Sequence, residues 1–285
     1  MDIKKERYIN PFTDFGFKKL FGEEANKDLL ADFLNELLRK EKGNIKTIIY
    51  LKNEHLPYFG ERKAIFDIYC ENDAGEKFIV EIQKVKQNFF KDRTVYYSTF
   101  PIQDQAVKGD WNFRLQSVYT VGILDFVFDD GDKDKTVVTE VKLMDIEKKK
   151  VFYDKLTFIY LQMPNFSRTE DELETHFDKW LYVIKNLHRL QTRPVKLQEH
   201  IFEKLFGIAE IEKLGYEERM VYEDSLKVYR DLKNSLDTAR EEGEKKKASE
   251  IAAEMLIDDE PVTKISKYTG LSAEEIGLIR QRLEK

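Results

Sequence analysis

Residues 61–83 have the sequence ERKAIFDIYCENDAGEKFIVEIQ. Two runs of strand-forming residues, 63–71 and 77–83, flank the turn-forming stretch 72–75. A turn of this length between two such runs predicts an antiparallel β-hairpin. The polar side chains of the segment are therefore expected to face one another across two paired strands.

The register of the hairpin decides which side chains meet. If the turn is centred on Ala74, Asp67 lies opposite Glu81 and Ile65 lies opposite Gln83. Directly opposed residues lie about 5 Å apart at Cβ, and alternate residues of a strand share a face, so Glu81 and Gln83 point the same way. Three polar side chains are thus expected to gather in one small area.

Two opposed carboxylates repel each other unless a cation lies between them or water screens them. One interpretation is a metal site, whose hard oxygen ligands suit Mg²⁺ or Mn²⁺ better than zinc. The other is a solvated hairpin face. Ile65, Tyr69 and Ile79 share the face of Glu81 and Gln83, which counts against full solvation. Spacing alone leaves both interpretations open.

The chain resembles a known family over nearly its whole length. The matching segments, in order, are NPFTDFGFKKLFG at 10–22, LADFLNELL at 30–38, VEIQ at 80–83, FFKDRTVYYS at 89–98 and VYTVGILDF at 118–126. They are similar to the PD-(D/E)XK nuclease superfamily, and within it to the PD-(D/E)XK nuclease family transposases, which include the recombination-promoting nucleases. The resemblance implies an α/β fold with a restriction-endonuclease-like core, in which helices flank a mixed central sheet, and a helical C-terminal region.

The resemblance also implies roles for individual residues. Asp67 and Glu81 take the places of the two strand acids, and Gln83 takes the place of the usual lysine. The backbone carbonyl of Ile82 would complete the metal shell. Asp14 takes the place of the acid that the family has on its first helix. The implied activity is hydrolysis of DNA phosphodiester bonds with Mg²⁺ or Mn²⁺, in transposition or recombination. A glutamine can orient a water molecule but carries no charge, so this substitution bears on the rate.

Three basic residues are candidates for binding the DNA backbone. Lys18 and Lys19 lie on the predicted first helix, and Arg93 lies on a helix predicted soon after the hairpin. A guanidinium group pairs bidentately with phosphate or with a carboxylate. The ordinary alternatives are that the lysines form the solvated face of an amphipathic helix and that Thr13 or Asp14 caps it.

The composition predicts an intracellular, mixed α/β protein, with the cytoplasm as the expected location. The 285 residues are 41% hydrophobic and 13% aromatic, which is enough for one large core. No membrane-spanning segment is expected, and the first residues lack the apolar core of a signal peptide. With Cys70 as the single cysteine, neither a disulfide framework nor a cysteine-based metal site is expected.

The charge balance is unusual for a protein that binds DNA. The net charge is −6, so the affinity for phosphate must come from a local basic patch. The candidates, besides the two lysines of the first helix, are residues 84–93 and the N-terminal Lys4, Lys5 and Arg7.

The chain beyond the hairpin continues the α/β pattern. Three more strands are predicted, within 115–128, 134–147 and 155–162. The first of them contains a continuous apolar run, which predicts a central strand covered on both faces. Further on, Thr169 and Glu172 form a capping box that predicts the start of a helical second half.

We expect three parts: a nuclease-like domain over residues 1–200, a helical extension with a charged linker helix over 201–247, and a small helix-turn-helix-like tail over 248–285. Gly243 is expected to interrupt the linker helix. The last 28 residues hold five basic and six acidic side chains. A recognition helix is typically more basic, so oligomerisation or a simple helical hairpin is favoured for the tail over DNA reading.

Three functions remain open from the sequence. The first is a Mg²⁺-dependent DNA endonuclease, the second is a catalytically weak or inactive nuclease scaffold that acts through interactions, and the third is a nucleic-acid-binding regulator that uses the tail. The first is favoured because Asp67, Glu81 and Gln83 are all present. A double-strand cutter usually needs two sites, which favours a homodimer.

Overall fold

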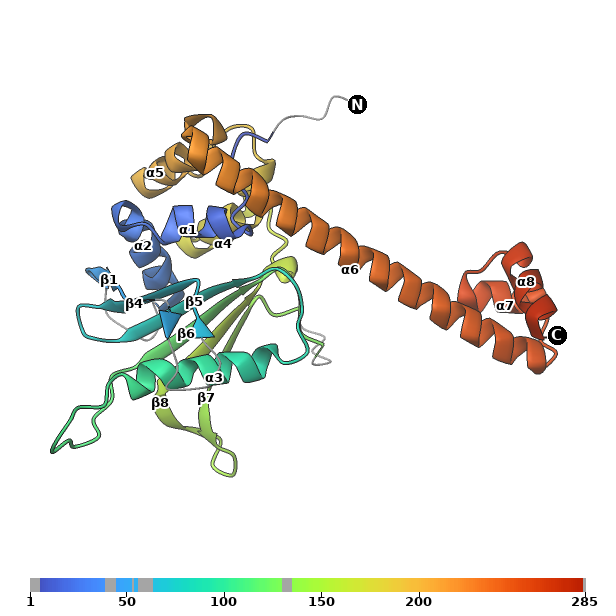
Figure 1. The fold of residues 1–285 in the computed structure, drawn as a ribbon, viewed down its shortest axis with the longest axis horizontal. Coiled ribbons are helices and arrows are strands. Elements are labelled where there is room, and N and C mark those ends of the chain that lie inside the picture. The colour runs from blue at the N-terminus through green and yellow to red at the C-terminus, as the bar shows by residue number, and fades with distance from the viewer. Residues whose placement is uncertain (1–5, 39–44, 53, 56–63, 130–134, 284–285) are drawn as a thin grey trace. The chain divides into compact units, whose positions relative to one another are not determined.

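The chain forms two compact units, residues 1–227 and 228–285. The computed structural model describes residues 6–38, 45–52, 54–55, 64–129 and 135–283 (Figure 1). The division between the units differs from the boundaries at 200 and 247 that the sequence suggested, because α5 (His200–Ala209) packs on the first two helices of the chain. Among the described helices, none is both long and apolar enough to span a bilayer.

A six-stranded mixed sheet forms the middle of the first unit. Its strand order is β1-β4-β5-β6-β8-β7, with β6 parallel to both β5 and β8 and the other neighbours antiparallel. The strands are β1 (Ile48–Tyr50), β4 (Ile68–Asn72), β5 (Lys77–Gln83), β6 (Val118–Leu124), β7 (Val138–Asp145) and β8 (Lys150–Gln162). Every residue of β6 is buried. The predicted mixed sheet with a central covered strand is confirmed.

Strands β4 and β5 form the predicted hairpin in the predicted register. Ile68 pairs with Val80 and Tyr69 pairs with Ile79, so paired residues are equally distant from Ala74. The turn places a glycine in the left-handed region, with φ of 76°, where the lack of a side chain avoids strain. The alternation along β5 and the turn chemistry were therefore sufficient to predict the pairing.

The first strand of the hairpin is shorter than predicted. Its N-terminal part, β3 (Ala64–Ile65), pairs with β2 (Glu54–His55) in a separate two-stranded sheet. The predicted opposition of Ile65 and Gln83 is therefore wrong. The physical reason is that the Asp67 N–H donates to a side chain of β5 instead of to its backbone, which ends the ladder. The first three residues of the predicted hairpin segment lie outside the described residues.

Helices lie on both sides of the sheet. They are α1 (Asp14–Phe21), α2 (Lys27–Leu38), α3 (Phe90–Gln103), α4 (His176–Asn186), α5 and the beginning of α6 (Tyr216–Ile257). Figure 1 shows α1, α2, α4 and α5 grouped together, with the sheet between them and α3. Tyr97 and Phe100 of α3 pack on the buried Phe66, whereas the helix group contains buried aromatic contacts such as Phe33 with Trp180. The sheet is therefore covered by helices, as predicted.

The helical second half begins later than predicted. Thr169 and Glu172 do form a capping box, but it closes only the short 3₁₀ helix Glu170–Glu172. Leu173 then adopts an extended conformation and buries its side chain. The α-helix α4 starts after Thr175, which makes a second capping box of its own. Burial of one leucine thus overrides the first helix-start signal.

The second unit is a small helical bundle. It consists of the end of α6 together with α7 (Val262–Thr269) and α8 (Ala273–Leu283). Its core is formed by Ala252, Ile265, Leu271 and Ile276. Gly270 ends α7 with φ of 74°, and Ser272 and Glu275 form a capping box at the start of α8. The helical pair predicted for the tail is present.

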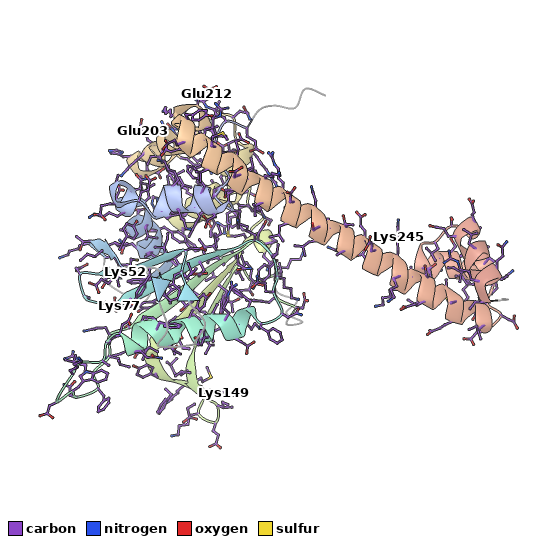
Figure 2. All side chains as sticks on the ribbon, viewed as in Figure 1. Lys52, Lys77, Lys149, Glu203, Glu212 and Lys245 are labelled. Atoms are coloured by element: carbon purple, nitrogen blue, oxygen red, sulfur yellow. The ribbon has the colours of Figure 1, made fainter. Side chains whose placement is uncertain are left out.

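The charged stretch before this bundle is helical throughout. Helix α6 continues through Gly243, so the interruption predicted there is wrong. A single glycine costs a helix only about 1 kcal/mol relative to alanine. The side chains around it are exposed, among them Lys245, which Figure 2 labels.

Candidate active site

Asp67 and Glu81 face each other at the open end of the β4–β5 hairpin. Ile68 pairs with Val80, and the next residue on each strand carries a carboxylate. The Asp67 N–H donates to Glu81 Oε1 at 3.0 Å, and the Ile82 N–H donates to Asp67 Oδ2 at 2.8 Å. Each carboxylate is therefore held by a backbone N–H of the opposite strand, which positions both side chains.

Burial and mutual repulsion dominate the electrostatics of this pair. Glu81 is only 7% exposed. Burial raises the pKa of Glu81, and the charge of Asp67 raises it further. Burial also raises the pKa of Asp67, to which the charge of Asp14 adds. Two opposed acids, one buried and one partly buried, form a site that a cation would stabilise.

Gln83 and Arg93 lie beside the two acids. Gln83 is buried; its Nε2 donates to the carbonyl of Val85 at 2.9 Å, and its Oε1 accepts a hydrogen bond from Arg93. Arg93 also donates to Gln87 Oε1 at 2.7 Å, and its charge lowers the pKa of Glu81. The guanidinium group thus binds two amide oxygens, whereas the sequence suggested a bidentate pair with a phosphate or a carboxylate.

Helix α1 brings one charged pair close to the acids. Asp14 and Lys18 form an ion pair at 2.8 Å, with both side chains about half exposed. The charge of Asp14 raises the pKa of Asp67, and the charge of Lys18 lowers it. The Thr13 hydroxyl caps the helix by accepting a backbone N–H at 2.9 Å. The residue that caps the helix is therefore Thr13, and the charge of Asp14 acts on Asp67.

Other basic residues suggested by the sequence are engaged elsewhere. Lys19 is bound to Glu218 at 2.6 Å, which joins α1 to the start of α6. Arg7 pairs at 2.7 Å with the acid that follows α5. Lys4 and Lys5 lie outside the described residues. Among the cations of the N-terminal segment that the structure describes, Lys18 is the one whose charge reaches the acid pair.

Lys84, which the sequence suggested only as the first residue of the basic stretch 84–93, lies within reach of the site. Strand alternation would place it on the face opposite Glu81, but β5 ends at Gln83. Burial lowers the pKa of Lys84, and the charges of Asp14 and Asp67 raise it. The ammonium group is therefore half-buried and within electrostatic reach of Asp14 and Asp67. In the sequence, its membership of the basic stretch 84–93 marks it as a candidate, but its place beside Asp67 depends on the end of β5.

Comparison of the sequence with models of known protein families assigns the chain to a family. The model of the PD-(D/E)XK nuclease family transposases matches residues 11–239. The chain belongs to this family. The matched region contains the sheet, both opposed carboxylates and α3, and it ends before α7. No curated protein and no solved structure matches the chain significantly.

Nucleases of the PD-(D/E)XK type generally use divalent metals, and the donor atoms of this family member fit such an ion. Asp67 and Glu81 offer two carboxylates, and oxygen is the donor that Mg²⁺ and Mn²⁺ favour. Over the described parts of the chain, no three His, Cys, Asp or Glu side chains converge as a metal site. A complete shell at the acid pair would therefore need a backbone oxygen such as that of Ile82, or water.

Proposed function

We propose that the chain is a metal-dependent endonuclease that hydrolyses phosphodiester bonds of DNA during transposition or recombination. The observation that carries this proposal is the pair formed by Asp67 and Glu81. Both carboxylates are held by backbone N–H groups across one strand pair, both pKa values are raised by burial, and family membership links such an arrangement to nucleases. Residues with perturbed pKa values in such a setting are candidates for function.

The residues of the site divide into three kinds. Asp67 and Glu81 would hold Mg²⁺ or Mn²⁺, with the carbonyl of Ile82 as a further ligand. When bound, the ion supplies Lewis-acid stabilisation and lowers the pKa of water. Gln83 orients neighbouring groups through its amide, and Arg93 is held by that amide. A guanidinium so placed neutralises charge that develops on a phosphate.

The cations on α1 and after β5 complete the proposed site. Lys18 and Lys84 both act electrostatically on Asp67. Their positive charges would attract the phosphate backbone to a protein whose net charge is −6. Asp14, paired with Lys18, would keep that ammonium group beside the acids. Cutting both strands takes two copies of the site, so a homodimer is part of the proposal.

Cleavage of supercoiled plasmid with Mg²⁺ or Mn²⁺ tests the proposal. Asp67→Asn and Glu81→Gln should each lower the nicking rate by about a hundredfold or more, because each removes a charged ligand. Asp73→Asn is the matched control: this acid is exposed on the turn of the same hairpin, and its variant should cut like the native protein. Light scattering of the native protein reports the oligomeric state.

Equal activity of all variants would assign the cleavage to a contaminant. Absence of cleavage by well-folded native protein with either metal would favour the alternative function, a nuclease-fold scaffold that acts through binding. Folding of each variant is checked by thermal unfolding before the activities are compared.

A further inference from the structure

A cavity of about 280 Å³ opens between the segment that follows β5 and the segment that follows β6. Its lining comes from the segment after β5 and the segment after β6: Lys86, Gln87, Asn88, Phe90, Lys91, Asp92, Phe126, Phe128 and Asp129. Strands β5 and β6 are parallel neighbours whose last pair is Gln83 with Leu124. The cavity therefore lies just beyond the carboxyl ends of two adjacent parallel strands, the place where α/β proteins commonly bind ligands.

Aromatic side chains form one wall of the cavity. Phe126 and Phe128 are partly exposed, with ring centroids 5.9 Å apart and planes at 77°. The buried Phe90 supports them from below, with its centroid 5.9 Å from that of Phe126. The Lys91 ammonium lies 4.7 Å from the centre of the Phe128 ring. Accessible aromatic rings of this kind are platforms on which planar bases stack.

The charges around the cavity balance. Lys86 forms an ion pair with Asp129, and Lys91 is matched in the lining by Asp92. A lining without net charge favours a neutral planar group over a phosphate. The amide of Asn88, on the exposed loop before α3, can donate and accept hydrogen bonds at the edge of such a group.

Hydrogen bonds connect the cavity lining to Gln83 through Arg93, which also acts on Glu81 by its charge. Gln87 lines the cavity and accepts a hydrogen bond from Arg93 at 2.7 Å. Arg93 binds Gln83 as well, and its charge acts on Glu81. Arg93 therefore contacts both the cavity lining and the side chain of Gln83, so a strand whose phosphate lies at the acids can place a nearby base in the cavity.

We propose that this cavity receives an unstacked nucleobase of the DNA strand that the site cuts. Because the rings of Phe126 and Phe128 are nearly perpendicular, the base stacks on one of them and meets the other at its edge. The proposal rests on the proposed nuclease function, because it takes the phosphate that is cut to lie at Asp67 and Glu81. A base in a duplex is stacked on both neighbours, so the cavity selects single-stranded or locally opened DNA over intact duplex.

Binding measured without divalent metal tests the cavity separately from cleavage. A fluorescent single-stranded oligonucleotide should bind the native protein more tightly than its blunt duplex. Phe126→Leu and Phe128→Leu keep apolar volume but remove the rings, and each should weaken single-strand binding about tenfold. Phe152→Leu is the matched control, since this phenylalanine is 80% exposed on β8 and lies outside the cavity lining; its variant should bind like the native protein.

A second measurement uses the native protein alone and does not depend on the folding of a variant. An oligonucleotide that carries 5-iodouracil is irradiated in complex with the protein, and the crosslinked residue is found by mass spectrometry. A crosslink to Phe126 or Phe128 is expected. A crosslink only elsewhere, or leucine variants that bind as tightly as the native protein, would overturn the proposal.

The two proposals can fail separately. If the native protein cuts plasmid but its leucine variants bind single strands normally, the proposed nuclease function stands and the proposed base-binding cavity is refuted. Protein that does not cut, but whose leucine variants lose single-strand binding, would retain the cavity and lose the nuclease.

Discussion

Replacing Glu81 by glutamine should stabilise the metal-free protein while abolishing its response to metal. Burial and the charge of Asp67 raise the pKa of Glu81 from its ordinary value of 4.5 to about 8. Each pKa unit corresponds to about 1.36 kcal/mol, so the proton that Glu81 takes up on folding costs at most about 3 kcal/mol at pH 7, where the unfolded side chain is ionised. Glutamine keeps an oxygen that can accept the Asp67 N–H and needs no proton.

The sign of the pH dependence follows from the direction of the shift. An acid whose pKa is higher in the folded state favours folding below its unfolded pKa, and this contribution is lost as the pH rises towards about 8. The Glu81→Gln variant should therefore exceed the native protein in stability by about 1–3 kcal/mol near pH 8, and the difference should shrink towards pH 4. For a unit of this size the gain corresponds to a rise in Tm of about 2–10 °C.

Thermal unfolding in EDTA and in excess Mg²⁺ measures both effects. Ligand that binds only the folded state raises the Tm, so Mg²⁺ should stabilise the native protein and leave the variant unchanged. A variant that is less stable than the native protein in EDTA at pH 8 would refute the electrostatic reasoning. An equal Mg²⁺ response of both proteins would refute the role of Glu81 as a ligand.

Three further predictions concern other parts of the first unit. Gly16→Ala should destabilise the protein by about 1–3 kcal/mol in urea unfolding, because the added Cβ would lie 2.1 Å from the Asn10 carbonyl oxygen. Arg93→Lys should lower plasmid cleavage, because lysine lacks the planar fork that binds two glutamine oxygens. The Tm should change little, and unchanged cleavage would show that Arg93 is not part of the proposed site. The hydrogen bond to Asp32 raises the pKa of His176, so this pair stabilises the fold below pH about 6.5, and the contribution is lost as the pH rises through the folded-state pKa. The free energies of unfolding of the native protein and of His176→Gln, measured in urea across this range, should therefore approach each other at high pH. A constant difference between the two would contradict the assignment.

Part of the candidate site could be predicted from local patterns. The opposition of Asp67 and Glu81 follows from a period-two alternation and a turn signal, and the structure has the register that these patterns predict. The role of Lys84 could not be predicted, because it depends on where β5 ends. The binding of Arg93 to Gln87 could not be predicted either, since it depends on how the loop after β5 folds back on α3.

The sequence by itself determined the elements whose causes are local. These are the hairpin with its turn, the apolar central strand β6, the caps of the tail helices and the family to which the segments belong. Strand alternation, glycine at positive φ and side-chain caps act over a few residues, so they are visible in the chain itself.

Only the tertiary structure decided how distant segments meet. Asp32 and His176 are 144 positions apart and still share a hydrogen bond at 2.7 Å. The cavity lined by Phe126 and Phe128 forms because the ends of β5 and β6 are neighbours in one parallel ladder. The ladder of β4 ends at Asp67 because its N–H binds a side chain. Such contacts are set by packing and by competition for hydrogen-bond partners across the whole fold, and no local pattern records the outcome.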